Sequence, residues 1–303
     1  MAQPPLPTRF DQGISLALGE AGPPDLAAAR QEFAAGASDG DVRAAHALAG
    51  FLAGGIGGPR DWQAAVDLLR LCAPRDGLAA MQTELISEMG LTADGLPASL
   101  PELKAVHSTK RISVAERLLS PKECEFLIRI ATPMLLGAKV ISVTNQIEDQ
   151  KNVRDNDHCG FAMLQEPPAI RAINLRVAAV SATDVRQGEP LQIMRYREGQ
   201  QYRTHLDRIS AGTNQRLMTA IIYLNDDFSG GETGFPVLDM AVRGRRGDAL
   251  LFRNLTEKGE VDRDMQHAGL PPTGGVKFIA SRWILERPAY DEQGNLLGET
   301  LWS

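Results

Sequence analysis

The sequence predicts an α+β protein in which a small helical segment precedes a sandwich or barrel of antiparallel strands. Two observations predict this fold class. The first hundred residues carry small and apolar side chains at helical spacing, whereas after about Glu189 short apolar runs alternate with glycines. With 303 residues, 43% of them hydrophobic, the chain is long enough for two moderate domains that each bury a core.

The N-terminal part is predicted to contain a helical hairpin. Residues 40–73 read GDVRAAHALAGFLAGGIGGPRDWQAAVDLLRLCA, which is two helical stretches on either side of a glycine-rich turn at 54–58. This pattern resembles a Sel1-like repeat, a relative of the tetratricopeptide repeat, and a partial second copy begins at 78–90. Because a helical pair cannot bury its apolar face alone, we expect further packing partners. A protein-binding module and a plain helical extension both remain open.

We place the α-helical segment at residues 1–95, a linker rich in Gly, Pro and small polar residues at 96–108, and the second domain at 109–303. In that domain residues 111–119 predict a strand. Residues 120–135 predict a helix with Ser120 as N-cap, Pro121 at the first position and Glu123 completing a capping box. A further helix is expected over 168–182. The strands expected after it are LQIMRY, RLMTAIIYL, DALLF and VKFIASRWIL.

Charge and composition argue against several classes of partner. Residues 1–108 account for the whole formal net charge of −6, no basic face stands out, and we expect no nucleic-acid partner. The apolar runs are too short to span a bilayer, and the N-terminus has no basic segment followed by an apolar one, so we expect no membrane partner and a cytoplasmic location. The three cysteines form no CxxC pair, which predicts ordinary buried thiols.

The most informative pattern is a candidate metal site. His205 and Asp207 are two residues apart in YRTHLD, so in a strand both side chains point to the same face. A second imidazole from a distant strand would complete the two-histidine, one-carboxylate set of non-haem iron(II) oxygenases. His267 lies between two predicted strands and is the third candidate ligand. The pair alone could be a surface His beside a surface Asp, so the argument depends on its neighbours.

Lys277 is the neighbour that changes the interpretation. It lies on the apolar strand VKFIASRW, ten residues after His267. An ammonium buried in a core needs an anionic partner, because an unpaired buried charge is costly. A dicarboxylic acid such as 2-oxoglutarate would chelate the metal at one end and meet Lys277 at the other. The alternative is a strand lysine that leans out to solvent.

These residues lie in segments that together resemble the prolyl 4-hydroxylase family of 2-oxoglutarate dioxygenases. The resemblance runs from about Arg111 to Glu286 with one register. Its segments are RLLSPKECEFLI, NVRDND, LQIMRYREGQQYRTHLD, NQRLMTAIIYLNDDFSGGETGFP, RGRRGDALLF and QHAGLPPTGGVKFIASRWI. It implies a double-stranded β-helix (jelly-roll) oxygenase core with flanking helices. It also implies Fe(II), 2-oxoglutarate and O2 as cofactor and co-substrates, and it leaves an ascorbate requirement open.

The resemblance also implies a role for each matching residue. His205, Asp207 and His267 match the iron ligands. The co-substrate positions are Lys277 at the 5-carboxylate, Tyr196 and Thr233 as hydrogen-bonding residues, and Trp283 near the pocket. Tyr202 matches a tyrosine beside the iron, Arg216 an arginine that contacts the substrate peptide, and Arg154 a loop that covers the site.

The sequence departs from the family on the substrate side. Leu285 stands where peptide-modifying members often carry a histidine, the loop at 208–214 is short, and NVRDND replaces the usual VRTS. The leading expectation is hydroxylation of an unactivated C–H bond in a prolyl or other residue of a peptide or protein, with succinate and CO2 as co-products. The alternatives are a small-molecule hydroxylase acting, for example, on a free amino acid, and a binding or sensing protein with a non-catalytic barrel. In each case the N-terminal helices are a candidate protein-partner site.

Overall fold

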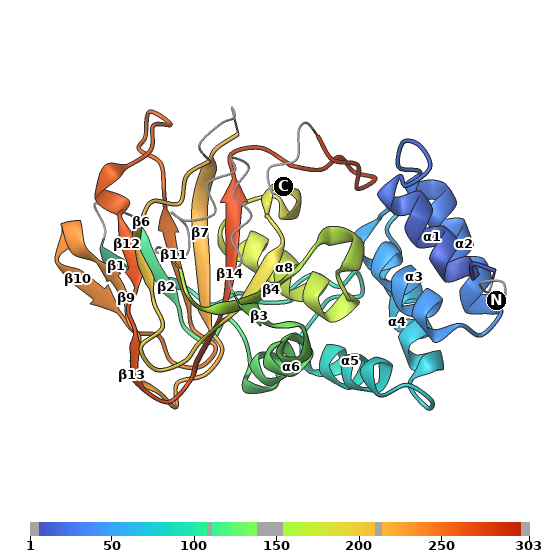
Figure 1. Ribbon diagram of the computed structural model, residues 1–303, viewed down its shortest axis with the longest axis horizontal. Coiled ribbons are helices and arrows are strands. Elements are labelled where there is room, and N and C mark those ends of the chain that lie inside the picture. The colour runs from blue at the N-terminus through green and yellow to red at the C-terminus, as the bar shows by residue number, and fades with distance from the viewer. Residues whose placement is uncertain (1–5, 108–110, 138–153, 210–213, 298–303) are drawn as a thin grey trace, which may run out of the picture. The chain divides into compact units, whose positions relative to one another are not determined.

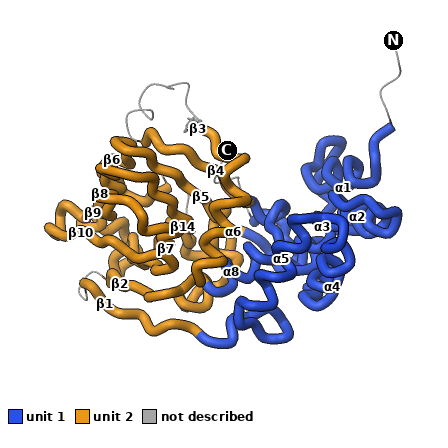
Figure 2. Tube along the Cα trace, turned by 90° about the horizontal axis from the view of Figure 1, so that it is seen from below, with its two compact units in different colours: residues 1–99, 162–176, 290–297 blue, residues 100–161, 177–289, 298–303 orange. Residues whose placement is uncertain are grey.

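The computed structural model describes residues 6–107, 111–137, 154–209 and 214–297 (Figure 1). The chain divides into two compact units (Figure 2). Unit 1 is built from stretches within residues 1–99, 162–176 and 290–297, and unit 2 from stretches within 100–161 and 177–289. Two stretches of the expected second domain therefore group with the helices, and the domain boundaries proposed from the sequence stay a prediction.

Unit 1 consists mainly of five helices, each packed against the next along the chain. They are α1 (Arg9–Leu18), α2 (Leu26–Ser38), α3 (Val42–Gly54), α4 (Trp62–Cys72) and α5 (Gly77–Glu88). An aspartate caps the start of every helix after the first: Asp25, Asp41, Asp61 and Asp76 each accept a backbone N–H with a side-chain oxygen. Each such cap contributes about 1 kcal/mol to helix stability.

The predicted hairpin is present as α3 and α4, with Gly55 and Gly57 in left-handed conformation in the turn between them. A Cβ on Gly57 would lie 2.1 Å from the carbonyl oxygen of Leu26, so only glycine fits there. Phe33 and Phe51 form the centre of the core, with ring centroids 5.0 Å apart in an edge-on arrangement. Assignment of these helices to the Sel1-like repeats remains a prediction.

Unit 2 contains two larger antiparallel sheets and a two-stranded one, which confirms the α+β class with an antiparallel sandwich. The large sheet has the order β1-β2-β11-β7-β14-β5-β4-β3, the small sheet β10-β9-β12-β6, and the two-stranded sheet pairs β13 with β8. The strands of the large sheet are β1 (Leu103–His107), β2 (Ile112–Ala115), β3 (Leu136–Gly137), β4 (Asp157–Phe161), β5 (Leu191–Tyr196), β7 (Arg216–Tyr223), β11 (Ala249–Arg253) and β14 (Lys277–Leu285). The others are β6 (Tyr202–His205), β8 (Ser229–Gly230), β9 (Thr233–Phe235), β10 (Met240–Val242), β12 (His267–Gly269) and β13 (Pro272–Gly274).

Within unit 2 the small sheet lies on one side of the large sheet and helix α6 (Pro121–Ala131) on the other (Figure 1). Ser120 and Glu123 form the capping box that the sequence predicts. The core between the sheets is mostly aromatic and aliphatic, and includes Tyr223, Phe235, Phe252 and Ile279. Because alternate residues of β5, β7 and β14 face this space, every second position of those strands reaches either the core or the pocket described below.

Three local expectations need correction. The predicted linker contains β1, which pairs with β2 at the edge of the large sheet, so 103–107 is a strand rather than a connection. The strand expected over 111–119 is shorter, Ile112–Ala115. Helix α8 (Pro168–Val180) ends two residues earlier than expected, because Ala182 turns into the left-handed region at φ 54° and Thr183 N–H closes the end on Ala178 O. No helix in the described part of the chain is long and apolar enough to cross a membrane.

Candidate metal centre and pocket

Three side chains that the sequence selected as ligands come together between the two sheets. β12 pairs with β6 so that His267 lies opposite His205, and Asp207 lies two residues after the end of β6. Nε2 of His205 lies 3.4 Å from Asp207 Oδ1, and Nε2 of His267 lies 3.4 Å from Asp207 Oδ2. Among the described residues this is the one group of three whose ligand atoms all lie within 4.8 Å of one another. Adjacent ligands of an ion with bonds of about 2.1 Å lie about 3.0 Å apart, so the set fits one divalent metal.

Both imidazoles are oriented for metal binding by their backbone surroundings. Nδ1 of His205 lies 2.8 Å from Arg203 O, and Nδ1 of His267 lies 3.0 Å from Met265 O. A carbonyl oxygen only accepts, so each Nδ1 carries the proton and donates it, and each Nε2 presents a lone pair to the pocket. The ring of Tyr202 stacks on that of His205 with 3.6 Å between centroids, which further limits the rotation of this imidazole.

The carboxylate of Asp207 is held by a chain of two hydrogen bonds that sequence reasoning missed. Thr219 Oγ1 donates to Asp207 Oδ2 at 2.6 Å, and Asn254 Nδ2 donates to Thr219 Oγ1 at 2.9 Å. All three side chains are buried. Burial by itself would raise the pKa of Asp207, but in the absence of a metal the positive charge of protonated His267 and His205 outweighs it and holds this pKa well below its ordinary value. The third candidate ligand is therefore an anion in a fixed orientation.

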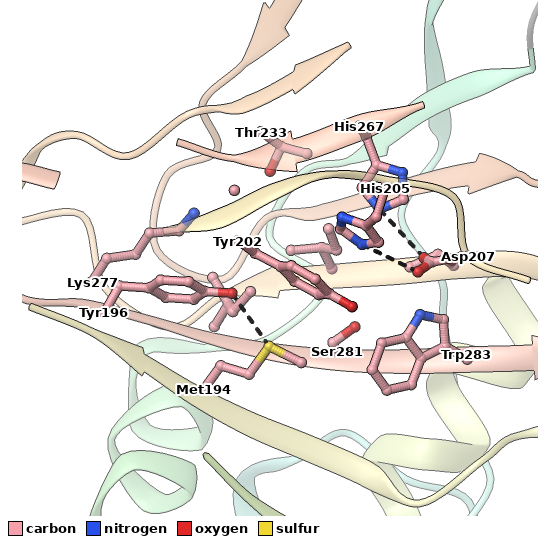
Figure 3. Close-up of a pocket in the computed structure, with 14 residues that line it drawn as sticks. Met194, Tyr196, Tyr202, His205, Asp207, Thr233, His267, Lys277, Ser281 and Trp283 are labelled. Carbon is pink, nitrogen blue, oxygen red and sulfur yellow. Dashed lines mark hydrogen bonds and ion pairs between the residues drawn. The ribbon is translucent and has the colours of Figure 1, made fainter. Parts of the chain in front are cut away.

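Lys277 lies in the same pocket, away from the three ligands (Figure 3). Its side chain is 1% exposed, and Nζ donates to Gly231 O at 2.7 Å. The rings of Tyr196 and Tyr223 flank it, with centroids 5.2 and 5.8 Å from Nζ. No carboxylate in the described ranges lies within ion-pair distance of Nζ, and burial lowers the pKa of Lys277 to about 8. An anion that enters the pocket would supply the missing partner.

Two neutral hydroxyls lie near Lys277, as the sequence predicts. Thr233 on β9 and Tyr196 on β5 both line the pocket. Thr233 Oγ1 is 3.0 Å from the hydroxyl of Tyr223, and Tyr196 donates to the thioether of Met194 at 3.5 Å, a weak acceptor. Burial raises the pKa of Tyr196, so its hydroxyl stays protonated and can donate to a ligand. Tyr223 was missed, although its spacing from Thr219 along β7 already placed both on one face.

The remaining predicted residues lie around the metal end. Trp283 and Ser281 of β14 lie beside Asp207, and Tyr202 separates them from the Lys277 end (Figure 3). The backbone of Arg154 forms an isolated antiparallel β-bridge with that of Tyr202. The guanidinium carbon of Arg154 lies 5.5 Å from the centre of the Tyr202 ring. The segment before Arg154 and part of the loop at 208–214 lie outside the described residues. Arg216 does not line the pocket directly but stacks on Trp283, which does.

The pocket contains about 380 Å³ of space not filled by atoms, part of which is open to solvent. One end offers three candidate metal ligands and the other a buried cation with neutral donors. This is the arrangement that a chelating dicarboxylate requires.

Comparison with known proteins agrees with this geometry. A family model described as the 2OG-Fe(II) oxygenase superfamily matches residues 191–285. A putative prolyl 4-hydroxylase of Acanthamoeba polyphaga mimivirus is 30% identical over 185 residues, which cover 57% of this chain and 74% of that protein. Probable prolyl 4-hydroxylase 3 of Arabidopsis thaliana is 31% identical over 199 residues and is covered to 69%. The chain belongs to the prolyl 4-hydroxylase-like 2-oxoglutarate/Fe(II) oxygenases.

Two further proteins are similar to this chain. Prolyl 4-hydroxylase 1 of Arabidopsis thaliana is 29% identical over 235 residues, with 70% of this chain and 83% of that protein covered. The solved viral collagen prolyl hydroxylase of Paramecium Bursaria Chlorella virus-1, in complex with 2OG, is 25% identical, with 60% of this chain and 99% of that chain covered and a TM-score of 0.47.

Membership of these oxygenases makes the chain a 2-oxoglutarate-dependent dioxygenase that uses Fe(II), 2-oxoglutarate and O2. When bound, iron and its co-substrates supply the oxidative decarboxylation and the hydroxylation of a C–H bond. The residues of the chain bind and orient these groups. The suggestion of a non-catalytic barrel was wrong, since the chain belongs to an enzyme family and its pocket contains the three candidate ligands and Lys277.

Proposed function

We propose that this oxygenase hydroxylates a prolyl residue in a peptide or protein. The observation that carries the proposal is one pocket with His205, Asp207 and His267 at one end and the ammonium of Lys277, which has no carboxylate partner among the described residues, at the other. The relatives named above are described as prolyl 4-hydroxylases, which supports a prolyl substrate for this chain as well.

In this proposal each residue has one task. His205, Asp207 and His267 bind Fe(II), and Lys277 pairs with the 5-carboxylate of 2-oxoglutarate. Tyr196 and Thr233 donate hydrogen bonds to the co-substrate, and the indole of Trp283 closes the wall beside the iron. Tyr202 holds His205 in place and faces the substrate. Arg216 and Arg154 contact the substrate.

The first experiment tests the enzyme. Protein purified without oxygen is supplied with iron(II) and 2-oxoglutarate, and succinate is followed after air is admitted. We expect wild type to form succinate and His205→Ala and Lys277→Ala to lose at least about 90% of that activity, since each removes a ligand that the reaction needs. Equal rates for all three proteins would refute the site assignment. Arg70→Ala, at an exposed ion pair in unit 1, is the control that should behave as wild type.

The second experiment tests the substrate. Proline-containing peptides and free amino acids are incubated with the enzyme, and products are analysed by mass spectrometry. Addition of one oxygen atom to a prolyl residue of a peptide supports the proposal. Oxidation of a metabolite alone would instead identify the small-molecule alternative, which the departures at Leu285 and residues 208–214 first suggested.

Two further expectations from the sequence stay proposals. The helices of unit 1 would present the target or bind a protein partner. A cytoplasmic location also remains a prediction.

A further inference from the structure

A buried ion pair lies beside the metal end of the pocket, and the proposed function so far makes no use of it. Arg216 Nε donates to Glu189 Oε1 at 2.6 Å, and Arg216 Nη2 donates to Glu189 Oε2 at 2.8 Å. The side chain of Glu189 is 3% exposed and that of Arg216 20% exposed. Arg216 was predicted from the sequence as a substrate contact, whereas Glu189, which lies 27 residues earlier, was not.

A β-bulge explains why Arg216 faces the pocket wall. β14 pairs with β7 so that Trp283 lies opposite Thr219, but Leu285 lies opposite Arg216, with a shift of register between Ile284 and Leu285. The shift places the Arg216 side chain on the opposite face of β7 from the one that regular alternation would give it. As a result its guanidinium carbon lies 4.2 Å from the centre of the Trp283 ring, and Trp283 lines the pocket next to Asp207 (Figure 3).

The backbone fixes the other half of the pair. Glu189 N–H donates to Trp283 O at 2.8 Å, so the segment before β5 is tied to the same tryptophan. Burial raises the pKa of Glu189, while Arg216 opposes this shift. Removing the arginine would therefore leave a carboxyl that is costly to keep ionised. Glu189, Arg216 and Trp283 form one rigid group, which we call the charge-masked corner.

This corner offers hydrogen bonds without net charge. The two contacts to Glu189 occupy Nε and Nη2 of Arg216, and no hydrogen bond of this guanidinium within the described ranges uses Nη1. The indole Nε1 of Trp283 is also buried without a partner in those ranges. Trp283 lines the pocket and the Arg216 guanidinium stacks on it, so both donors are available to an oxygen of a molecule that extends from the pocket past Trp283. A neutral amide carbonyl can accept from either donor, whereas a carboxylate would also meet the negative charge of Glu189 a few ångströms away.

We infer that Glu189 is a specificity-determining residue that cancels the charge of Arg216 and thereby selects an amide carbonyl over a carboxylate next to the reacting residue. This inference rests on the proposed function, since it concerns the group that follows the hydroxylated proline. Glu189 acts on the substrate through Arg216 and is a positioning residue.

The test compares two ligands that differ in one group. One short peptide ends in prolinamide and the other is the same peptide ending in proline with a free carboxylate. For wild type we expect the amide to have the higher kcat/KM. Glu189→Gln keeps the shape of the side chain but removes its charge, so Arg216 becomes a net cation. We expect the amide-to-carboxylate ratio of kcat/KM to fall by at least about tenfold, through the KM of the carboxylate peptide, since a unit charge at about 5 Å acts with this strength in a partly screened site.

Two variants and one condition sharpen the result. Glu125→Gln removes a charge from the exposed ion pair with Arg246 and should leave the ratio unchanged. The double variant Glu189→Gln/Arg216→Gln is neutral again and should restore the preference for the amide. The increase in kcat/KM for the carboxylate peptide in Glu189→Gln should also shrink at high salt, because salt screens the attraction between the carboxylate and Arg216. Calorimetric binding of both peptides to oxygen-free protein loaded with Mn(II) and 2-oxoglutarate gives the same ratio for any variant with slow turnover.

The failure of this inference differs from the failure of the proposed function. If neither peptide is bound or hydroxylated by wild type, the prolyl substrate is wrong. If both are, and Glu189→Gln leaves the ratio as in wild type, Glu189 does not set the selectivity. A ratio that falls in Glu189→Gln and stays low in the double variant would also overturn the inference, because Arg216 would then not be the group whose charge is masked.

Discussion

The hydrogen-bond chain behind Asp207 should control metal affinity, and Thr219→Val tests this directly. Valine has nearly the same shape as threonine, so no cavity forms and only the hydroxyl is lost. The substitution removes the 2.6 Å hydrogen bond to Asp207 Oδ2 and leaves Nδ2 of Asn254, which is 3% exposed, without its acceptor.

The magnitude follows from these two losses. A hydrogen bond to a charged group contributes about 1.5–3 kcal/mol, and a buried donor left unpaired costs about 1–3 kcal/mol. Part of this free energy is already lost in the folded protein without metal, so the stability of that protein falls. The rest is lost when the carboxylate is no longer held in the orientation that binds the metal, and outer partners of metal ligands typically change affinity by about 10–100-fold. We expect the dissociation constant for Fe(II) or Co(II) to rise within this range and the melting temperature to fall by several degrees.

The assay is titration of oxygen-free protein with Co(II), followed by visible absorbance, together with thermal unfolding by circular dichroism. Thr219→Ser keeps the donor and should bind metal within a few-fold of wild type. Thr132→Val removes an exposed hydroxyl that contacts only the backbone of its own helix and is the control for the substitution itself. Wild-type metal affinity in Thr219→Val, with normal folding, would show that this hydroxyl does not orient Asp207.

Three other expectations follow from the structure. Because the pKa of Lys277 is lowered to about 8, the lysine loses its charge as pH rises through that value. The KM for 2-oxoglutarate should therefore increase when the pH is raised beyond about 8. Lys277→Arg stays charged, so its KM should not show this increase. The metal binds only the folded site, so Co(II) at a hundred times its dissociation constant should stabilise the protein by about 2.7 kcal/mol in urea unfolding, and a chelator should abolish this gain. Asp76→Ala removes the N-cap of α5, whose side-chain oxygen lies 2.7 Å from Ala79 N, and a contact of 2.8 Å with His46 Nε2. The free energy of unfolding should therefore fall by about 1–2 kcal/mol. Asp67→Ala, at an exposed ion pair, is the control and should leave the urea midpoint unchanged.

The sequence by itself determined the elements whose signals are local. The capping box at Ser120 depends on residues three apart, and the strand LQIMRY appears as β5 with the expected bounds. The two-residue spacing of His205 and Asp207 placed both side chains on one face before any pairing was known. The burial of Lys277 followed from its apolar neighbours along the strand.

The tertiary structure decided what depends on pairing between distant strands. Residues 103–107 have no apolar alternation of their own and become a strand only because β2 offers a free edge. The two hydrogen bonds of the Asp207–Thr219–Asn254 chain join residues 12 and 35 positions apart, so the chain exists only in one register of β7 and β11. Likewise Arg216 was predicted from the sequence as a substrate contact. Its ion pair with Glu189 and its stacking on Trp283 depend on the bulge opposite Leu285, which no local spacing predicts. The candidate metal ligands were therefore predictable from the sequence, whereas the groups that orient them and the charge-masked corner depend on register.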